Sequence, residues 1–338
     1  MSTIYDIAKA AKTSPASVSR VMNGRGGVKT ETALRIKQTM EAMDFQPRWK
    51  VLDRDRFLVF VPEYGHVFDS GYVARVMSGI TDAAFAAGFG LQLRPFSSQG
   101  KDVGELRQLY MQEAASGCIL ISLYQAYSLQ DRLDLAKLPH VVVGHKRQDD
   151  EICQVLLDDF DAGKSAAEFL LSLGHKRIDM VSFSHLDHAH FDRYRGFAEA
   201  MGLAGAKEPA CIQCNTDTYE TGRSAARRLL SPLERPSAVI VTNENIAVGF
   251  QAEARAMNFS IPGDLSLIAF EDTDKLSLLD TPVSAMQAPA YEMGVEAVRM
   301  LRSTIAAAGK KASKSEPGYL TKHLAIPLVV RYTTATAK

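Results

Sequence analysis

The chain has 338 residues, of which 46% are hydrophobic and 23% are charged. A single hydrophobic core seldom grows beyond about 250–300 residues, so the length favours two or three domains. The composition is that of a globular protein and excludes a fibrous repeat or wholesale disorder. The sequence has no long apolar run and no export signal at its start, so we expect a cytoplasmic protein without membrane association.

The formal net charge is zero, but the charge is unevenly distributed along the chain. Residues 1–50 contain nine Lys or Arg and four Asp or Glu, which gives this segment a net charge of +5. The other residues keep 30 of the 39 basic and 35 of the 39 acidic side chains, a net charge of −5. A basic segment on an otherwise acidic chain indicates that this segment meets a polyanion.

Three short helices are predicted within the first fifty residues. The first follows Thr3, a good N-cap, and lasts about two turns. Ser14 caps the second helix, and Pro15 takes its first position, where the missing N–H costs nothing. This helix runs to about Asn23, and the third extends from Thr30 to about Met43.

The turn between the first two helices is short, which is typical of a helix-turn-helix. In that motif the second helix lies in the DNA major groove, with its N-terminal residues at the base edges. Val18, Val21 and Met22 lie on one side of the second helix, and small or polar residues lie mostly on the other. The third helix offers four apolar anchors, which are Leu34, Ile36, Met40 and Met43. A plain three-helix bundle with a solvated basic face would show the same charge pattern.

The ordered signature T-I-Y-D-I-A…S-P-A-S-V-S-R-V-M-N-G resembles the lactose-repressor/galactose-repressor family of bacterial transcription regulators. The resemblance implies that Ser14, Pro15, Ala16 and Arg20 face the bases. It also implies that a second group contacts phosphates or supports the helix packing: Thr3, Tyr5, Ser17, Ser19 and Asn23. Arg20 is the only long donor on this face, and arginine paired to guanine is the commonest specific contact.

The segment after the third helix departs from that family. Its members usually carry a hinge helix whose leucine enters the minor groove, but here that position is Arg54. One hypothesis is that Leu52 or Trp49 supplies the wedge in a shortened hinge. The alternative is a linker that only tethers the helices and contacts phosphates through Arg48, Lys50 and Arg54.

From Phe57 onward, short apolar runs alternate with helical stretches as far as Phe270. Apolar strands separated by helices predict parallel sheets covered on both faces. About ten strands are too many for one comfortable sheet of this kind, so we expect an α/β body of two doubly wound lobes.

Ligands of such sheets bind beyond the carboxyl ends of the strands. Polar or aromatic residues follow several of the predicted strands, and these are Tyr64, Phe68, Ser122, Asn243, Glu244, Glu271 and Asp272. Amides and carboxylates can hydrogen-bond to hydroxyl groups, and aromatic rings can pack on the apolar face of a sugar.

The family resemblance extends to the body through the motifs R-Y-R-G-F at 193–197, T-N-E-N-I-A-V-G at 242–249 and I-P-G-D-L-S-L-I-A-F-E-D at 261–272. It implies a periplasmic-binding-protein-like body whose chain crosses between the lobes near Asp158, Ser284 and Gly318. Arg193 stands at the family's effector-clamping arginine, Asn243 at its asparagine, and Glu271 at its usual aspartate. His145 falls in a motif that departs from the family and is a further candidate for the effector.

Several other motifs carry little chemistry. Gly163-Lys164-Ser165 lacks the earlier glycine of a phosphate loop, and Cys211-x-x-Cys214 lacks a second pair and lies on a predicted strand. His185, His188 and His190 have neither sulfur ligands nor a regular helical pair beside them, which favours a polar loop over a metal site. We therefore expect no metal and no cofactor.

The sequence thus predicts a dimeric DNA-binding regulator, most simply a repressor of sugar catabolism or transport genes. It would bind palindromic double-stranded DNA and respond to a sugar-like effector in a cleft between the lobes. The residues near the C-terminus lack the apolar heptads of a tetramerising helix, so we expect a dimer rather than a tetramer. The alternative is a sugar-processing enzyme on the same body, for which Glu271 and Asp272 would be the acid/base pair.

The expected domain boundaries follow from these elements. They comprise a helix-turn-helix domain (1–46), a hinge or linker (47–56), an effector-binding and dimerisation body (57–332) and a tail (333–338). Within the body, the N-lobe takes about 57–157 and 286–317, and the C-lobe about 158–284 and 318–332.

Overall fold

The computed structural model describes residues 4–22, 27–43, 45, 56–62, 71–96, 110, 113, 115–121, 138–144, 152–183, 188–206, 209–309 and 320–338. The chain divides into two compact units, which we call the head (Met1–Asp53) and the body (Arg54–Lys338). The expected linker, apart from Arg56, lies outside the described residues, and so do both hinge hypotheses.

The head contains the three predicted helices, α1 (Ile4–Ala10), α2 (Pro15–Met22) and α3 (Thr30–Ala42). Ser14 accepts a 3.1 Å hydrogen bond from the backbone N–H of Ser17, which confirms the predicted cap of α2. Lys12 has a positive φ of 48° in the turn between α1 and α2. The Nε of Arg35 donates a 3.0 Å hydrogen bond to the carbonyl of Ala11, which joins α3 to this turn.

A small apolar core holds the head together. Its buried members are Ile7, Ala8, Ala11, Val18 and Ile36, with Val21, Met22, Met40 and Met43 among those packed against them. The prediction for Leu34 is wrong, because this side chain is 56% exposed. Ile36 and Met40 lie on one face of α3, and Leu34, two positions before Ile36, lies on the opposite face.

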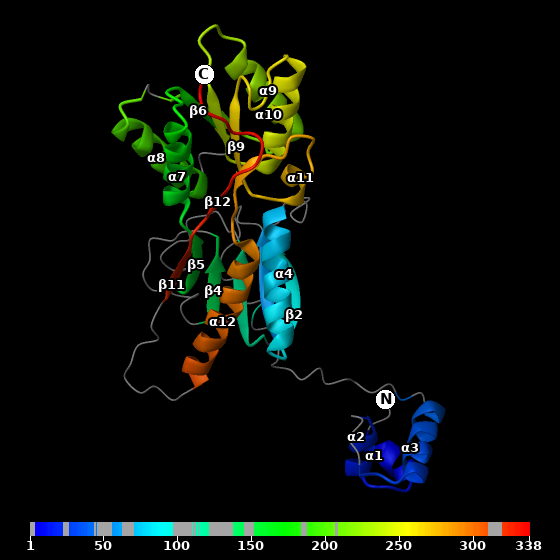
Figure 1. Ribbon diagram of the computed structural model, residues 1–338. Coiled ribbons are helices and arrows are strands. Elements are labelled where there is room, and N and C mark those ends of the chain that lie inside the picture. Colours follow the sequence, from blue (N-terminus) through cyan, green and yellow to red (C-terminus); the bar gives the residue numbers. More distant parts are fainter. Residues whose placement is uncertain are drawn as a thin grey trace. The chain divides into compact units, whose positions relative to one another are not determined.

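The described residues of the body form two six-stranded sheets, which define an N-lobe and a C-lobe (Figure 1). The N-lobe sheet has the order β11-β5-β4-β3-β1-β2, and its paired strands are parallel. Its strands are β1 (Arg56–Pro62), β2 (Gly90–Phe96), β3 (Gly117–Ile121), β4 (His140–Val143), β5 (Gln154–Leu157) and β11 (Thr321–Leu324).

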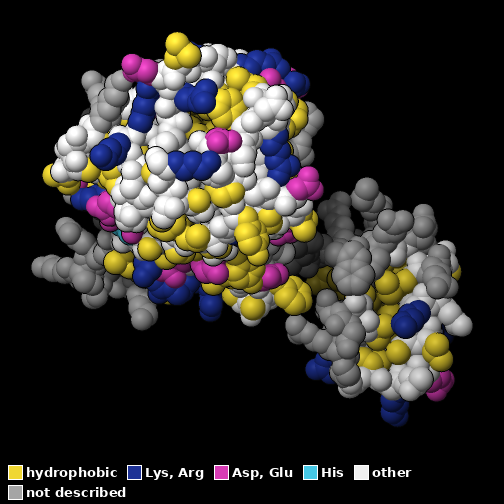
Figure 2. Space-filling view, turned by 45° about the horizontal axis from the view of Figure 1, so that its top comes forward, with side chains coloured by type: hydrophobic (Ala, Val, Ile, Leu, Met, Phe, Trp, Pro, Cys, Tyr) yellow, Lys and Arg dark blue, Asp and Glu magenta, His cyan; other side chains and the backbone are white. Residues whose placement is uncertain are grey.

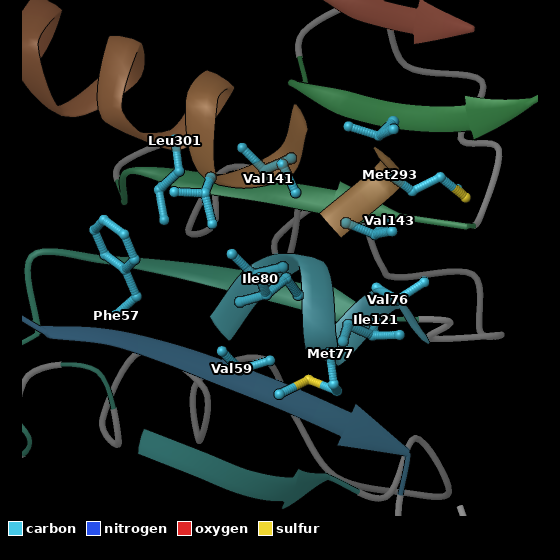
Figure 3. Close-up of a cluster of buried hydrophobic side chains, with 14 of the residues drawn as sticks. Phe57, Val59, Val76, Met77, Ile80, Ile121, Val141, Val143, Met293 and Leu301 are labelled. Atoms are coloured by element: carbon cyan, nitrogen blue, oxygen red, sulfur yellow. The ribbon is translucent and has the colours of Figure 1, made fainter. Parts of the chain in front are cut away.

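Among the described helices, α4 (Gly71–Ala86) and α12 (Ala290–Gly309) pack against this sheet. Figure 3 shows the cluster that they form with it, in which Ile80 and Met293 from the helices meet Val59 and Val141 from the strands. The two helices approach closely, because a Cβ added at Gly79 would lie 2.0 Å from the carbonyl oxygen of Tyr291. Only glycine allows that approach.

The C-lobe sheet has the order β12-β10-β9-β8-β6-β7, and only β12 among its strands is antiparallel to its neighbour. Its strands are β6 (Ile178–Phe183), β7 (Cys211–Cys214), β8 (Ala238–Val241), β9 (Ser266–Phe270), β10 (Ser284–Met286) and β12 (Leu328–Val329). One apolar cluster includes α7 (Asp159–Ser172) and α8 (His188–Leu203). Another includes α9 (Tyr219–Leu230), α10 (Glu244–Ala256) and the short α11 (Asp274–Ser277). The predicted α/β body of two doubly wound lobes is therefore confirmed.

Within the described part of the body, the chain passes between the lobes at three points. It leaves the N-lobe between Leu157 and Asp159 and returns between Met286 and Ala290. The third crossing lies between Leu324 and Leu328, so the expected position near Gly318 is wrong. Residues 321–324 pair in parallel with β5 and complete the N-lobe sheet before the chain leaves it.

Other differences concern elements beyond the predicted alternation. The helices and strands after Phe270, including the 20-residue α12, were not among the predicted elements. Helix α8 begins at His188 rather than Arg193, so His188 and His190 are helical and the polar-loop interpretation is wrong for them. The predicted helix at 103–116 falls largely outside the described residues.

The expected tail, residues 333–338, is part of the C-lobe. Thr333 is fully buried, and its hydroxyl donates to the carbonyl of Leu267 over 2.7 Å. The backbone N–H of Ala335 donates to Ser266, and that of Ala337 donates to the carbonyl of Leu173. These bonds attach the segment to the start of β9 and to the end of α7, which explains why the segment is not a free end.

The body surface mixes the two signs of charge. On the face that Figure 2 presents, Lys and Arg side chains lie singly or in small groups, with acidic side chains among them. Such a face does not create the single-sign field that favours a polyanion.

Candidate functional site

The second helix of the head presents the predicted base-facing residues to solvent. Ser14, Pro15, Ala16 and Arg20 are exposed, whereas Val18 on the same helix is completely buried. Ser17 and Ser19 are half-buried, and Tyr5 on α1 is 74% exposed. Three further predicted contacts, Thr3, Asn23 and Arg48, lie outside the described residues. The head therefore buries one side of α2 and leaves the other side available to a groove.

In the body, the carboxyl ends of the two sheets face the crossings. The chain leaves the N-lobe from the carboxyl end of β5 and leaves the C-lobe from the carboxyl end of β10. The strands beside β5 and β10 that belong to the parallel part of each sheet end at the same edges. Residues that follow these strands thus lie near the junction of the lobes, where open α/β sheets bind ligands.

Arg193 on α8 is a buried arginine at this edge, with only 5% of its surface exposed. Its Nε donates to Asp159 Oδ1 over 2.7 Å, and its Nη1 donates to the carbonyl of Thr242 over 3.2 Å. The guanidinium also lies 4.5 Å from the ring centroid of Phe270. Burial raises the pKa of Asp159, although the charge of Arg193 acts in the opposite direction.

Asp159, rather than Asp158, is thus the acidic partner at the start of α7. Asp158 instead accepts from Nδ1 of His323 on β11, at 2.8 Å. The two aspartates are adjacent in the sequence, and the hydrogen bonds of the structure distinguish their roles. A close crossing of α7 and α8 holds the pair in place: a Cβ at Gly196 would lie 1.9 Å from the carbonyl oxygen of Phe160.

Asn243 and Glu271 meet at the ends of β8 and β9. The Asn243 amide nitrogen donates to Glu271 Oε2 over 3.2 Å. Its amide oxygen accepts from the backbone N–H groups of Asn245 and Ile246, so Asn243 also caps α10. Glu271 has a positive φ of 66°, which is unfavourable for a residue with a Cβ. Burial raises the pKa of the Glu271 carboxyl to about 7.

The structure places Asp272 differently from the expected effector contact. Its two carboxylate oxygens accept from Nη1 and Nη2 of Arg331, each over 2.8 Å, and one also accepts from Gln287 over 3.3 Å. Asp272 is 8% exposed and therefore serves an ion pair within the C-lobe. It is not available to a ligand as Glu271 is, because adjacent residues at a strand end point apart.

His190 is a residue that sequence reasoning misplaced. It is buried, and its Nδ1 lies 2.9 Å from the hydroxyl of Thr242. Burial holds the pKa of His190 well below its ordinary value, so the imidazole is neutral at pH 7. Of the other predicted effector residues, Tyr64, Phe68, Ser122 and His145 lie outside the described residues, as does His185.

Two family models match the chain. The model of bacterial regulatory proteins of the lacI family matches residues 3–48, and that of the periplasmic binding protein-like domain matches residues 167–333. The chain belongs to the lacI family.

Named relatives of this lacI-family protein are regulators. It is 26% identical to catabolite control protein A of Priestia megaterium over 307 residues, which cover 88% of this chain and 91% of the relative. The catabolite control protein A of Staphylococcus aureus strain Mu50 is 23% identical over 305 residues, with the same coverage. The chain is thus a lacI-family transcription regulator, and these named relatives are regulators rather than enzymes.

Solved structures share the fold of this lacI-family chain. The lac repressor dimer bound to operator and the anti-inducer ONPF has a TM-score of 0.78 at 19% identity, with 99% of each chain covered. A complex of the transcriptional regulator CelR with cellobiose has a TM-score of 0.70 at 23% identity, with 98% of this chain and 100% of that chain covered. A lacI-family regulator of Enterococcus faecium with bound ribose also has a TM-score of 0.70, at 22% identity, with 84% of this chain and 100% of that chain covered.

Two further findings concern the expectations that the protein does not cross a membrane and is not an enzyme. No helix among the described residues has the length and apolar character needed to cross a membrane. The enzyme alternative required Glu271 and Asp272 as an acid/base pair, but Asp272 is held by Arg331. This observation and the regulatory relatives both oppose that alternative.

Proposed function

We propose that the protein represses genes of sugar catabolism or transport, binds a palindromic operator as a homodimer, and is switched by a sugar-like effector held between its lobes. The observation that carries the effector part is the convergence of Arg193, Asn243 and Glu271 at the carboxyl ends of the C-lobe strands. A guanidinium, an amide and a carboxylate together offer donors and acceptors to several hydroxyl groups.

The relatives support the sugar class. Two solved regulators of the same fold hold cellobiose and ribose, and the lac repressor dimer holds operator and an anti-inducer. We keep Tyr64, Phe68, Ser122 and His145 in the proposed contact set, and omit Asp272 because of its pairing with Arg331. A regulator of chromosomal genes would act in the cytoplasm.

The proposed dimer has support in the exposed apolar side chains of the body. Phe85 on α4 is 85% exposed, Leu278 after α11 is 82% exposed, and Leu93 lies on β2, which is the edge strand of the N-lobe sheet. Exposed apolar residues and an open strand edge favour association with a second copy. Two heads on a two-fold dimer would read two half-sites of a palindrome.

Selection of genomic DNA fragments by the full-length chain tests the DNA-binding part. We expect enriched fragments that contain an inverted repeat, and a binding constant that falls steeply with salt. Enrichment of no fragment would overturn the proposal.

A thermal-shift panel of neutral sugars and sugar phosphates on the full-length chain tests the effector part. An effector at about 100 times its dissociation constant stabilises the folded state by about 2.7 kcal/mol. A sugar that stabilises the chain should also change the affinity of the chain for the selected DNA fragment, measured at the same salt concentration with and without the sugar. Absence of stabilisation by every sugar would exclude this effector class.

A further inference from the structure

The first turn of α4 in the N-lobe lies directly against the C-lobe. A Cβ built at Gly71 would lie 2.7 Å from Cγ2 and 3.6 Å from Cβ of Thr273, the residue that precedes α11. The same Cβ would lie 3.6 Å from Oε1 of Glu244, the first residue of α10. Arg75, one turn later on α4, forms a 3.5 Å ion pair with Asp274. Figure 1 shows the end of α4 beside α11.

Glu244 anchors the C-lobe side of this contact. It is 2% exposed, and its carboxylate accepts hydrogen bonds from the Thr273 hydroxyl and, over 3.0 Å, from the Lys275 ammonium. A buried carboxylate is retained only where such donors satisfy it. It also lies beside the N-terminus of α4, whose N–H groups favour a negative charge. Glu244 therefore fixes Thr273 against α4 and adds an electrostatic attraction between the lobes.

This contact is linked to the proposed effector residues by two parallel side-chain bonds. The Asn243 amide donates to Glu271, and the Thr273 hydroxyl, two residues after Glu271, donates to Glu244, the residue after Asn243. Both bonds join the turn between β8 and α10 to the turn between β9 and α11. A ligand that displaces the first bond acts on the two turns that also hold the second.

We propose that Glu244 is a positioning residue for an interlobe latch formed by Gly71 and Thr273, and that this latch sets the arrangement of the lobes and hence the affinity for DNA. The inference rests on the proposed function for its consequence on DNA binding. The latch itself is a contact between lobes and can be measured without DNA. A side chain at position 71 would meet the Thr273 methyl group, so glycine fits this contact as long as residue 273 is threonine.

Hydrogen exchange on the full-length chain tests the anchor. Glu244→Gln removes the charge, and Glu253→Gln is the matched control, since Glu253 is a buried glutamate on the same helix that pairs with Arg223 and Arg227 instead. We expect amides of residues 71–76 to exchange at least about fivefold faster in Glu244→Gln and at the wild-type rate in Glu253→Gln. Equal exchange at these amides in both variants would overturn the role of Glu244. Glu244→Asp should restore slow exchange in part.

A cross-link tests the latch even if Glu244→Gln fails to fold. Disulfides need a Cβ–Cβ distance of about 3.5–4.5 Å, and Gly71 and Thr273 are separated by 3.6 Å on this measure. The double variant Gly71→Cys, Thr273→Cys should therefore form a disulfide under mild oxidation, and Gly71→Cys alone should not. Failure of the pair to cross-link would overturn the contact.

The oxidised and reduced forms are then compared on the genomic fragment that the wild-type chain selects. We expect the disulfide to change the affinity by about tenfold, and the direction identifies whether the latched arrangement binds or releases DNA. An unchanged affinity would overturn the regulatory role. If the wild-type chain selects no fragment, the proposed function fails, whereas exchange and cross-linking still decide whether the latch exists.

Discussion

Arg20 of the head and Arg193 of the body are both candidate recognition residues, but they are held in opposite ways. Arg20 is exposed on a short helix over a small core. Arg193 is 5% exposed and already bonded to Asp159 and to the backbone of Thr242. The head can therefore gain its contacts when DNA replaces solvent and counterions. The body holds its polar groups in place before any ligand arrives. Substitutions in the head should thus affect binding alone, whereas those in the body should affect stability as well.

Replacement of Arg193 by methionine should have the largest effect. It leaves Asp159 buried without its partner, which costs about 3–5 kcal/mol of unfolding free energy. Denaturant unfolding of the full-length chain measures the loss. Arg195→Met is the matched control, because Arg195 lies on the same helix with a 56% exposed side chain. Its effect should stay below about 1 kcal/mol.

A second substitution shows whether the unpaired charge is the cause. Asp159→Asn added to Arg193→Met removes the remaining charge and should restore a large part of the stability. If the double variant is as unstable as the sum of the two single variants, the cost arises from lost packing on Phe270 rather than from Asp159.

The glycine at the crossing of α7 and α8 gives the next largest effect. Gly196→Ala places a methyl group 1.9 Å from the carbonyl oxygen of Phe160, so the helices must separate, at a cost of about 1–3 kcal/mol. Gly202→Ala on the same helix meets no atom within 4 Å and should stabilise by up to about 1 kcal/mol. Thermal unfolding of both variants checks the contrast. Similar changes would mean that the close crossing does not hold the site.

The head could be predicted closely because its signals are local. The cap at Ser14, the proline after it and the spacing of Ile7, Ala8 and Val18 act within a few residues, and the first two helices begin where these signals place them. The prediction that Leu34 is buried was wrong, because it relied on the apolar character of the side chain, whereas its position on α3 faces solvent.

The body was predictable as a sequence of elements but not as a set of contacts. Apolar runs identified the strands, and the motifs located Arg193, Asn243 and Glu271. The partners of these residues come from distant segments: Asp159 lies 34 positions before Arg193, and Arg331 lies 59 positions after Asp272. Pairing over such distances depends on tertiary packing, which no local pattern encodes. The third crossing between the lobes was placed near Gly318 rather than after Leu324 for the same reason, since its position depends on which strand β11 joins.

Arg20 provides the converse test of the comparison. Arg20→Ala should weaken binding to the selected fragment by about 10- to 100-fold, through lost base contacts, and leave the melting temperature nearly unchanged. Arg20→Lys keeps the charge but not the two-pronged geometry, so it should retain binding to random DNA and lose the preference for the fragment. Fluorescence anisotropy with both DNAs measures this. A large drop in stability would show that Arg20 supports the fold of the head.

The smallest expected effect concerns Glu271. Burial raises the pKa of its carboxyl group to about 7. The unfolded chain has an ordinary glutamate there, with a pKa near 4.3, so the folded state binds the proton more tightly. The stabilisation of the folded state by this group is fully present below the unfolded pKa and is lost as the pH rises through about 7.

The substitution Glu271→Gln removes this pH-dependent loss of stability. The variant should therefore gain about 1–2 kcal/mol over the wild type at pH 8 and much less at pH 5, after allowance for the partial exposure of the side chain. Unfolding curves at the two pH values decide the matter. A gain that is equal at both would mean that the hydrogen bond with Asn243, rather than buried charge, governs this position.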